Sequence, residues 1–311
     1  MQVFEIAKVR PPTENYSLSI NSHFNCPWGK CAFCGSAFFH KSRKFKRRSL
    51  EEIKGDIDKA RLLNDYLLES GDFDHINILN AISKYPELQE CIIHLTYWHN
   101  YSGASTAFLG GANPLVYKSE FLTEILNYLK ETFPSIKRIT SYGRTKTSTK
   151  KHDSYFKDLH DAGLDRIHVG LESGSDNVLK FINKGVSSEG HIIGGNKIKD
   201  GGISLSVYVM PGLGGRKWST EHALETARVI NALEPDFVRL RTLEIFPITP
   251  LYNYLRSGEF EELREEEVVR EIKILVENIN CNTTVTSDSA ANLLIDVWGK
   301  FPTDKEKTMR Q

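Results

Sequence analysis

Three cysteines stand close together in residues 25–35 (NCPWGKCAFCG). Cys26, Cys31 and Cys34 have the spacing C-x4-C-x2-C, which lets three sulfurs converge on one inorganic centre. Thiolates suit both iron–sulfur clusters and zinc. A cubane iron–sulfur cluster held by three cysteines leaves one iron open to an external molecule, whereas a structural zinc site is closed by a fourth protein ligand. The choice between these centres decides the function.

The main alternative is a structural zinc protein with a Cys3His site, in which His23 or His40 is the fourth ligand. A disulfide is disfavoured, because a cytoplasm is reducing and the five cysteines are an odd number. Cys91 and Cys281 stand alone in the sequence. We expect both to be ordinary buried thiols.

The charges of the chain are balanced, with forty Lys and Arg against forty Asp and Glu in 311 residues. No net field therefore draws the whole molecule to nucleic acid or to a membrane. The N-terminus MQVFEIAKVRPP lacks the apolar core of a signal peptide, and no run of about 18 apolar residues occurs. We expect a cytoplasmic protein with no membrane partner and no clear nucleic-acid partner.

Hydrophobic periodicity predicts strands that alternate with helices. The expected strands are 16–22, 106–109, 136–142, 165–172, 203–210 and 237–246, and the expected helices are 49–63, 119–132, 150–162, 188–200, 219–233 and 261–279. Such alternation implies right-handed crossovers and a parallel sheet, either open or closed into a barrel. The cysteines, the glycine pairs and Glu172 all follow strand ends, which is where parallel α/β folds place active sites.

Three segments fall outside this alternation. Residues 1–14 are an expected N-terminal extension and 281–311 an expected C-terminal tail, which leaves a core at 15–280. Residues 64–105 have no clean period, and we interpret them as an insertion over the barrel mouth. Residues 41–48 carry six positive charges in eight positions, which is typical either of a solvated loop or of a binding surface.

The motifs together resemble the radical S-adenosylmethionine (radical SAM) superfamily, in particular its oxygen-independent coproporphyrinogen oxidase-like and Elp3-like core. The mark of that family is a three-cysteine turn after the first strand, and here it is followed at barrel spacing by FLGGANP, GLESGSD and YVMPGLGG. A zinc site predicts none of these later motifs. The resemblance implies an α/β fold, a partial (β/α)6 TIM-type barrel with parallel strands and short terminal extensions.

The resemblance further implies a [4Fe-4S] cluster on Cys26, Cys31 and Cys34, with SAM chelating the fourth iron. Phe33 stands before the last cysteine, where the family has an aromatic residue beside the adenine. The usual spacing in the family is C-x3-C-x2-C, so this chain has one residue more between its first two cysteines.

SAM contacts are implied at six further positions. These are Gly110, Gly111, Ser141, Glu172, Lys184 and Met210. The glycine pair resembles the motif that receives the SAM amino group, and Glu172 with Lys184 resembles a polar and basic pair that binds SAM. Met210 belongs to the motif beside the ribose and adenine.

Each of these positions also has a plainer explanation. Gly110 and Gly111 suit an ordinary strand-ending turn, and Lys184 suits a helix C-terminus. Arg239, Arg241 and Glu244 alternate in the last expected strand, so they either point into the barrel or form structural salt bridges.

The function implied by the resemblance is reductive cleavage of SAM to methionine and a 5'-deoxyadenosyl radical, which removes hydrogen from an unidentified small-molecule or peptide substrate. The expected electron donor is a flavodoxin or ferredoxin docking on residues 41–48. A competing function is a haem carrier related to coproporphyrinogen oxidase, with ligands from His94, His99 and Cys91.

Overall fold

The computed structural model describes residues 4, 6–7, 9–35, 44–71, 73–295 and 297–310. Its main sheet has eight strands in the order β1-β4-β5-β6-β7-β8-β9-β10. The strands are β1 (Leu18–Asn21), β4 (Thr106–Gly110), β5 (Arg138–Gly143), β6 (Leu164–Glu172), β7 (Ser204–Val209), β8 (Phe237–Leu240), β9 (Thr283–Ser287) and β10 (Val297–Phe301). Every neighbouring pair from β1 to β9 is parallel, and β10 is antiparallel to β9. The predicted α/β class with a parallel barrel-type sheet is confirmed.

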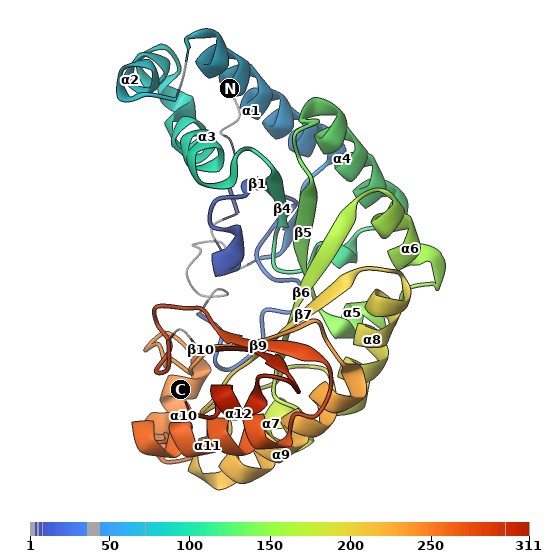
Figure 1. The fold of residues 1–311 in the computed structure, drawn as a ribbon, viewed down its shortest axis with the longest axis vertical. Coiled ribbons are helices and arrows are strands. Elements are labelled where there is room, and N and C mark those ends of the chain that lie inside the picture. The colour runs from blue at the N-terminus through green and yellow to red at the C-terminus, as the bar shows by residue number, and fades with distance from the viewer. Residues whose placement is uncertain are drawn as a thin grey trace.

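Helices follow most strands and cover the outer side of the sheet, where α4, α6 and α8 are seen in Figure 1. The helices are α1 (Leu50–Glu69), α2 (His75–Lys84), α3 (Gln89–Ser102), α4 (Ser119–Thr132), α5 (Thr145–Ser148), α6 (Ser154–Asp161), α7 (Asp176–Phe181), α8 (Ser188–Asp200), α9 (Gly215–Leu233), α10 (Pro250–Ser257), α11 (Glu265–Asn278) and α12 (Lys305–Thr308). Among the residues described, none of these helices has both the length and the apolar character needed to cross a bilayer.

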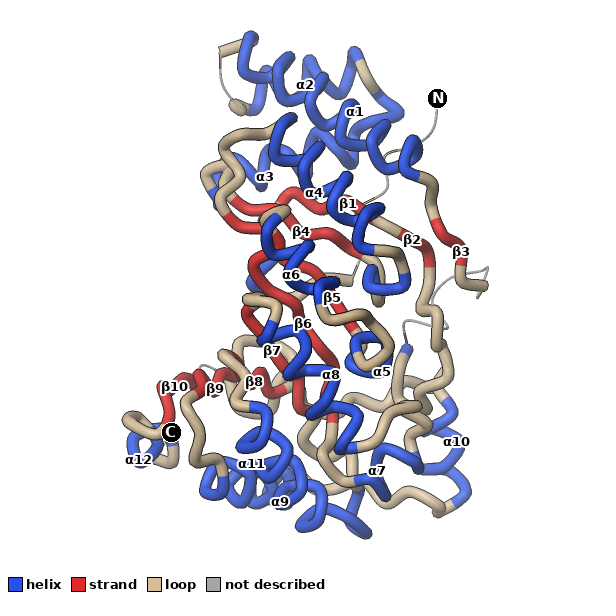
Figure 2. Tube along the Cα trace, turned by 90° about the vertical axis from the view of Figure 1, so that its right-hand side faces the viewer, coloured by secondary structure: helices blue, strands red, loops and turns tan. Residues whose placement is uncertain are grey.

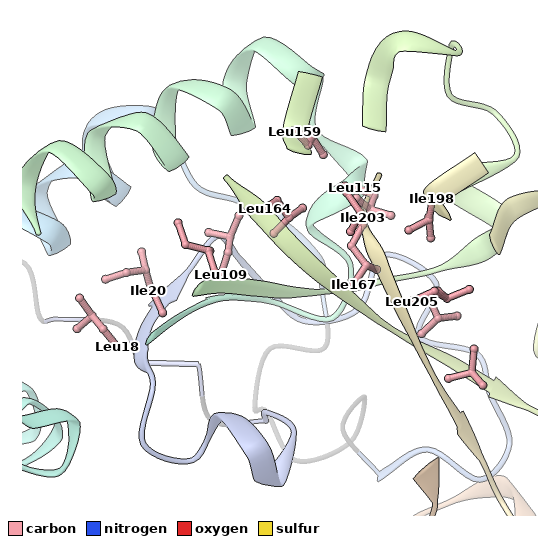
Figure 3. Packing of buried hydrophobic residues seen from close by; sticks show 14 of the residues in the cluster. Leu18, Ile20, Leu109, Leu115, Leu159, Leu164, Ile167, Ile198, Ile203 and Leu205 are labelled. Atoms are coloured by element: carbon pink, nitrogen blue, oxygen red, sulfur yellow. The ribbon is translucent and has the colours of Figure 1, made fainter. Parts of the chain in front are cut away.

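The two faces of the sheet have different surroundings, one against the helices and the other inside the curved sheet. Leu109, Ile167 and Leu205 belong to one apolar core with Leu159 and Ile198 from the helices, as Figure 3 shows. Complete burial of such a side chain contributes about 1.5–3 kcal/mol. Since successive strand residues point to opposite faces, the residues between them line the inside of the curved sheet. These include Phe108, Thr140, His168, Ser206 and Tyr208.

The expected insertion over the barrel mouth is corrected by the structure, since residues 64–105 complete α1 and form α2 and α3. Helix α3 packs along β1, the first edge of the sheet (Figure 2). His94 Nε2 accepts a hydrogen bond from the backbone N–H of Ser19 at 2.8 Å, and Trp98 donates to the carbonyl of Thr106 at 2.7 Å. The segment therefore covers the edge strand β1 and pairs one of its backbone N–H groups, that of Ser19.

The C-terminal part also differs from expectation. Residues 281–311 are not a separate tail, because β9 and β10 extend the sheet beyond six strands. The alternating burial of residues 297–301 (VWGKF) is the period-2 signal of this strand. Strand β8 ends at Leu240 rather than 246, because the side chain of Asn292 binds the backbone N–H of Thr242 and the carbonyl of Leu240.

The N-terminal extension places a carboxylate inside the barrel. Glu14 is fully buried, and it binds Arg138 at 2.8 Å and Ser17 at 2.7 Å, with His168 Nε2 at 3.7 Å. Burial by itself raises the pKa of Glu14, but the interactions with His168, Arg138 and Ser17 outweigh it and lower the pKa to about 2.

Glu14 is therefore expected to stabilise the fold at neutral pH and to lose this contribution in acid. A folded-state pKa below the unfolded value gives stability that is present above about pH 4.5 and disappears as the pH falls toward about 2, worth about 3 kcal/mol. Denaturant unfolding between pH 6 and pH 3 should show a smaller pH dependence for Glu14→Gln than for the wild type. Glu124→Gln, at an exposed pair with Lys54, is the control and should leave the pH dependence unchanged.

Candidate metal and cofactor site

The cysteine loop is held between three segments of the barrel rim. It follows β2 (His23–Phe24), which pairs with β3 (Lys46–Arg47). The backbone N–H of Ala32 donates to Ile182 at the end of α7, and the carbonyl of Ala32 accepts from Leu251 at the start of α10. Trp28 donates to the carbonyl of Asn183 at 2.8 Å. The loop is thus fixed at the C-terminal ends of the strands, where the sequence predicts the active site.

Cys31 lies in an environment shaped by burial, by the other two cysteines and by two cations. Burial raises the pKa of Cys31 to about 11, with Cys34 and Cys26 raising it further, and with Lys184 and Arg144 opposing the shift. All three side chains are half-buried and free of disulfides. Thiolates bound to iron or zinc carry negative charge, so nearby Lys and Arg side chains favour the bound form.

The donor chemistry fits a thiolate-held cluster. Within the described residues, no three His, Cys, Asp or Glu side chains are already gathered around one point as ligands for a single ion. A cubane cluster binds each thiolate through a different iron, so its three sulfurs need not meet at one point.

His23 does not serve as the fourth ligand of the alternative zinc site. Its Nε2 accepts from the N–H of Asn113 at 3.2 Å, and its Nδ1 lies 2.9 Å from the hydroxyl of Ser22. Both ring nitrogens are therefore occupied, and burial followed by the charge of Arg47 lowers the pKa of His23 to about 4. His40, the other candidate ligand, lies outside the described residues.

Glu172 and Lys184 form a buried ion pair beside the cysteine loop. The two side chains are 2.9 Å apart, with 11% and 9% of their surfaces exposed. Burial alone lowers the pKa of Lys184, but Glu172 and Cys31 outweigh it and the pKa is raised. Gly170 leaves the necessary room, since a Cβ there would lie 2.0 Å from the Glu172 carboxylate. Sequence reasoning selected this pair, and the structure brings it together.

The end of β6 carries a local distortion at Glu172. The register of β6 against β7 shifts between Gly170 and Glu172, and Glu172 has a φ of +63°. A non-glycine residue in the left-handed region costs of order 1–3 kcal/mol, which is typical of functional sites. The distortion turns the carboxylate toward Lys184.

Phe33 and Met210 join this pair. Both pack in the small apolar cluster that also contains Ala32. Lys184 Nζ lies 5.8 Å from the centre of the Phe33 ring, and the backbone N–H of Met210 donates to the carbonyl of Glu172 at 3.0 Å. Four of the sequence-predicted contact residues are thus linked by contacts at the part of the rim that holds the cysteine loop.

Gly110 and Gly111 have packing reasons to be glycine. A Cβ on Gly110 would lie 2.1 Å from the Cβ of Ala7, and one on Gly111 would lie 2.4 Å from the His23 ring. Gly111 also has a φ of +106°, which side-chain-bearing residues rarely adopt. A contact of this turn with SAM stays a prediction.

Ser141 lies on the other face of the sheet. It alternates with Tyr142 and shares the helix-covered face with Ile139. Its hydroxyl donates to the carbonyl of Leu109 at 2.8 Å, which ties β5 to β4. We therefore leave Ser141 out of the proposed site.

Sequence reasoning missed the aromatic lining of the barrel. Tyr142, His168 and Tyr208 stand on adjacent strands. The centre of the His168 ring lies 6.2 Å from that of Tyr142 and 6.2 Å from that of Tyr208. Period-2 alternation within β5, β6 and β7 is the signal that selects these positions.

The arginines of the last expected strand point into this lining. Arg239 and Arg241 both bind the carboxylate of Asp288, which follows β9. Glu244 lies beyond the end of β8 and is exposed, so it takes no part in this arrangement.

The proposed haem ligands are used in other ways. His94 accepts from Ser19, and His99 binds Asn64 at 2.7 Å while its ring stacks on Phe73. Cys91 is buried, and burial raises its pKa. These side chains belong to the helical edge of the sheet, so the haem alternative is wrong in its ligand assignment.

The basic residues at 41–48 are not all exposed. Residues 41–43 lie outside the described residues, whereas Lys44, Lys46 and Arg47 are described and not buried. Arg48 is buried in an ion pair with Asp56 at 2.7 Å, so it does not belong to a docking surface.

Part of the chain is similar to known proteins. The sequence model of the radical SAM superfamily matches residues 82–227. The tRNA uridine(34) acetyltransferase of Methanocaldococcus infernus is 21% identical over 297 residues, which cover 89% of this chain and 52% of that protein. The chain therefore spans about half the length of this relative.

Two solved structures share the fold. Coproporphyrinogen III oxidase (HemN) from Escherichia coli, a radical SAM enzyme, has a TM-score of 0.52 at 14% identity, over 88% of this chain and 58% of that chain. The radical SAM methyltransferase TsrM from Kitasatospora setae has a TM-score of 0.53 at 14% identity, over 78% of this chain and 39% of that chain.

Proposed function

We propose that the chain is a radical SAM enzyme that cleaves SAM at a [4Fe-4S] cluster held by Cys26, Cys31 and Cys34; the match of the radical SAM sequence model to residues 82–227 supports this. When bound, these cofactors supply the electron transfer and the 5'-deoxyadenosyl radical that removes hydrogen from a substrate. One observation carries the proposal. The buried Glu172–Lys184 pair lies against the cysteine loop, where Lys184 Nζ is 5.8 Å from the centre of the Phe33 ring.

The chain's own residues have distinct roles in this proposal. Glu172 accepts hydrogen bonds from SAM, and Lys184 fixes the Glu172 carboxylate while its charge favours the thiolate of Cys31. Phe33 and Met210 provide an apolar surface for the adenine. The aromatic lining below them excludes water from the reacting atoms.

The substrate can be sought by direct assay. A tRNA uridine is the first candidate to test, because the M. infernus relative is named as a tRNA uridine(34) acetyltransferase. The balanced charge of this chain provides no overall attraction to nucleic acid. A tRNA should therefore bind only through a local surface or through a further protein.

The proposal is tested by anaerobic reconstitution with iron and sulfide. We expect about four irons per chain, a brown protein, and a change in the electron paramagnetic resonance spectrum of the reduced cluster when SAM is added. A reduced cluster whose spectrum is unaffected by SAM would contradict the proposed open iron.

We further propose that the described basic residues beside the cysteine loop receive an acidic flavodoxin or ferredoxin. Lys46 and Arg47 form β3, which pairs with the strand leading into the loop. Asn25, at the start of that loop, donates to the carbonyl of Lys44 at 2.8 Å. Positive charge is thus placed next to the point where an electron must arrive.

Reversal of Lys44, Lys46 and Arg47 to glutamate is expected to slow reduction by flavodoxin about tenfold at low salt, because steering of an acidic partner is lost. The rate should also lose its salt dependence, since exposed charges are screened within about 8 Å at physiological ionic strength. Stopped-flow measurement of cluster bleaching gives both quantities. Dithionite, a small reductant, is the control and should act at the wild-type rate; equal slowing with both reductants would indicate a damaged loop instead.

A further inference from the structure

We propose that Arg239 and Arg241 bind a carboxylate or phosphate group of the substrate, at the place that Asp288 occupies in this structure. The inference rests on the proposed function only in calling the ligand a substrate. It assigns the substrate to the class of molecules that carry a carboxylate or phosphate group.

The two arginines hold one carboxylate between them. Arg239 binds one oxygen of Asp288, and Arg241 Nη2 binds the other at 2.8 Å. Arg239 is also fixed by its Nε, which donates to the hydroxyl of Ser206 at 3.0 Å. A guanidinium presents several N–H groups in a rigid plane, so a pair of them is suited to a planar carboxylate or to a phosphate.

The pair carries an excess positive charge. Asp288 is the single carboxylate that pairs with either arginine in the described part of the chain, so two cations share one anion. Only 3% of the Arg239 side chain is exposed, and burying an incompletely balanced charge is costly. Asp288 and Arg241 are 25% and 19% exposed, so an anion from solvent can reach them.

Buried polar atoms without partners provide a second, independent observation. Ser19 Oγ, Thr140 Oγ1, His168 Nδ1 and Tyr208 Oη have no hydrogen-bond partner within the described residues. All four side chains are at least nine-tenths buried. They occupy inward-facing positions of β1, β5, β6 and β7. Because buried polar groups are normally hydrogen-bonded, the lining is suited to a polar ligand.

The arginines and the SAM residues are joined by the aromatic lining. The Arg241 guanidinium lies 4.9 Å from the centre of the Tyr208 ring. Tyr208 lies on β7 next to Val209, which is paired with Glu172 of β6. Tyr208 therefore connects the arginines to the strand end that carries Glu172. A substrate anchored on the arginines would extend toward Glu172.

The experiment removes the internal carboxylate and measures anion binding. In the reconstituted protein with SAM, Asp288→Asn is expected to bind inorganic phosphate or acetate about tenfold more tightly than the wild type, because the competing carboxylate is gone. Calorimetric titration at low ionic strength measures both probes, and the tighter of the two identifies the phosphate or the carboxylate class. Adding Arg241→Gln to Asp288→Asn should abolish the gain.

A matched control is Glu225→Gln, which frees Arg228 on the surface of α9 from a pair of 2.7 Å. It should bind neither anion more tightly than the wild type. Equal gains in Asp288→Asn and Glu225→Gln would overturn the inference. If Asp288→Asn does not fold, Arg241→Gln against Arg241→Lys replaces it, and equal anion affinity of these two would also overturn the inference.

The two proposals fail in different ways. The same preparations are assayed for bound iron and for SAM cleavage. Cleavage of SAM without any arginine-dependent anion binding would refute only the substrate class. Loss of the cluster in the wild-type chain would refute the proposed function, whatever the anion titration shows.

Discussion

Cys31→Ala is expected to abolish the iron–sulfur absorbance and all cleavage of SAM, which is the largest effect we predict. Two thiolates cannot hold a cubane cluster that leaves one iron open for SAM, because three of its irons need protein ligands. The charge of Cys31 also contributes to the raised pKa of Lys184. Cys26→Ala and Cys34→Ala should give the same result.

Cys281→Ala is the matched control. Cys281 is a buried thiol that lies against the carbonyl of Ile230, far in sequence from the loop. The variant should keep about four irons per chain by iron assay and absorbance. Retention of a full iron complement in Cys31→Ala would mean that another residue is the third ligand.

Lys184→Met is expected to destabilise the fold by about 3–5 kcal/mol and to remove SAM binding. The substitution leaves the Glu172 carboxylate buried without its cation, which is the costly way to break a buried pair. Glu172→Gln keeps the shape and should weaken SAM by more than about twofold while retaining the cluster. Denaturant unfolding and SAM titration measure the two effects separately.

Lys157→Met tests whether the loss of any lysine pair has this effect. Lys157 binds Asp161 at 2.8 Å, but the two side chains are 69% and 58% exposed. Solvent screens exposed pairs of this kind and they contribute little to stability, so this variant should resemble the wild type. Unchanged SAM affinity in both Lys184→Met and Glu172→Gln would show that the pair is structural.

The alternation of strands and helices could be predicted because each strand between β4 and β7 is a buried run bounded by glycine or polar turns. The cysteine turn and the Glu172–Lys184 pair could be selected through the family resemblance. Their contact could not be predicted from spacing, since it depends on the positive φ of Glu172 and on the missing side chain of Gly170.

Other features required the tertiary structure. The helical edge formed by residues 64–105 depends on His94 reaching the backbone of Ser19, a contact across 75 positions of sequence. Ser141 was selected for standing at a strand end, but its place in the alternation puts it on the helix-covered face. Asp288 follows a strand that was interpreted as part of a tail, so its contact with the arginines was missed.

The central claim is tested most directly by the formation of 5'-deoxyadenosine. The reconstituted chain, reduced under anaerobic conditions in the presence of SAM, is predicted to release 5'-deoxyadenosine and methionine, detected by liquid chromatography and mass spectrometry. Release should require both the reductant and the three cysteines. A chain that takes up stoichiometric zinc in place of the cluster, or a fully loaded chain that releases no 5'-deoxyadenosine on reduction, would contradict the account.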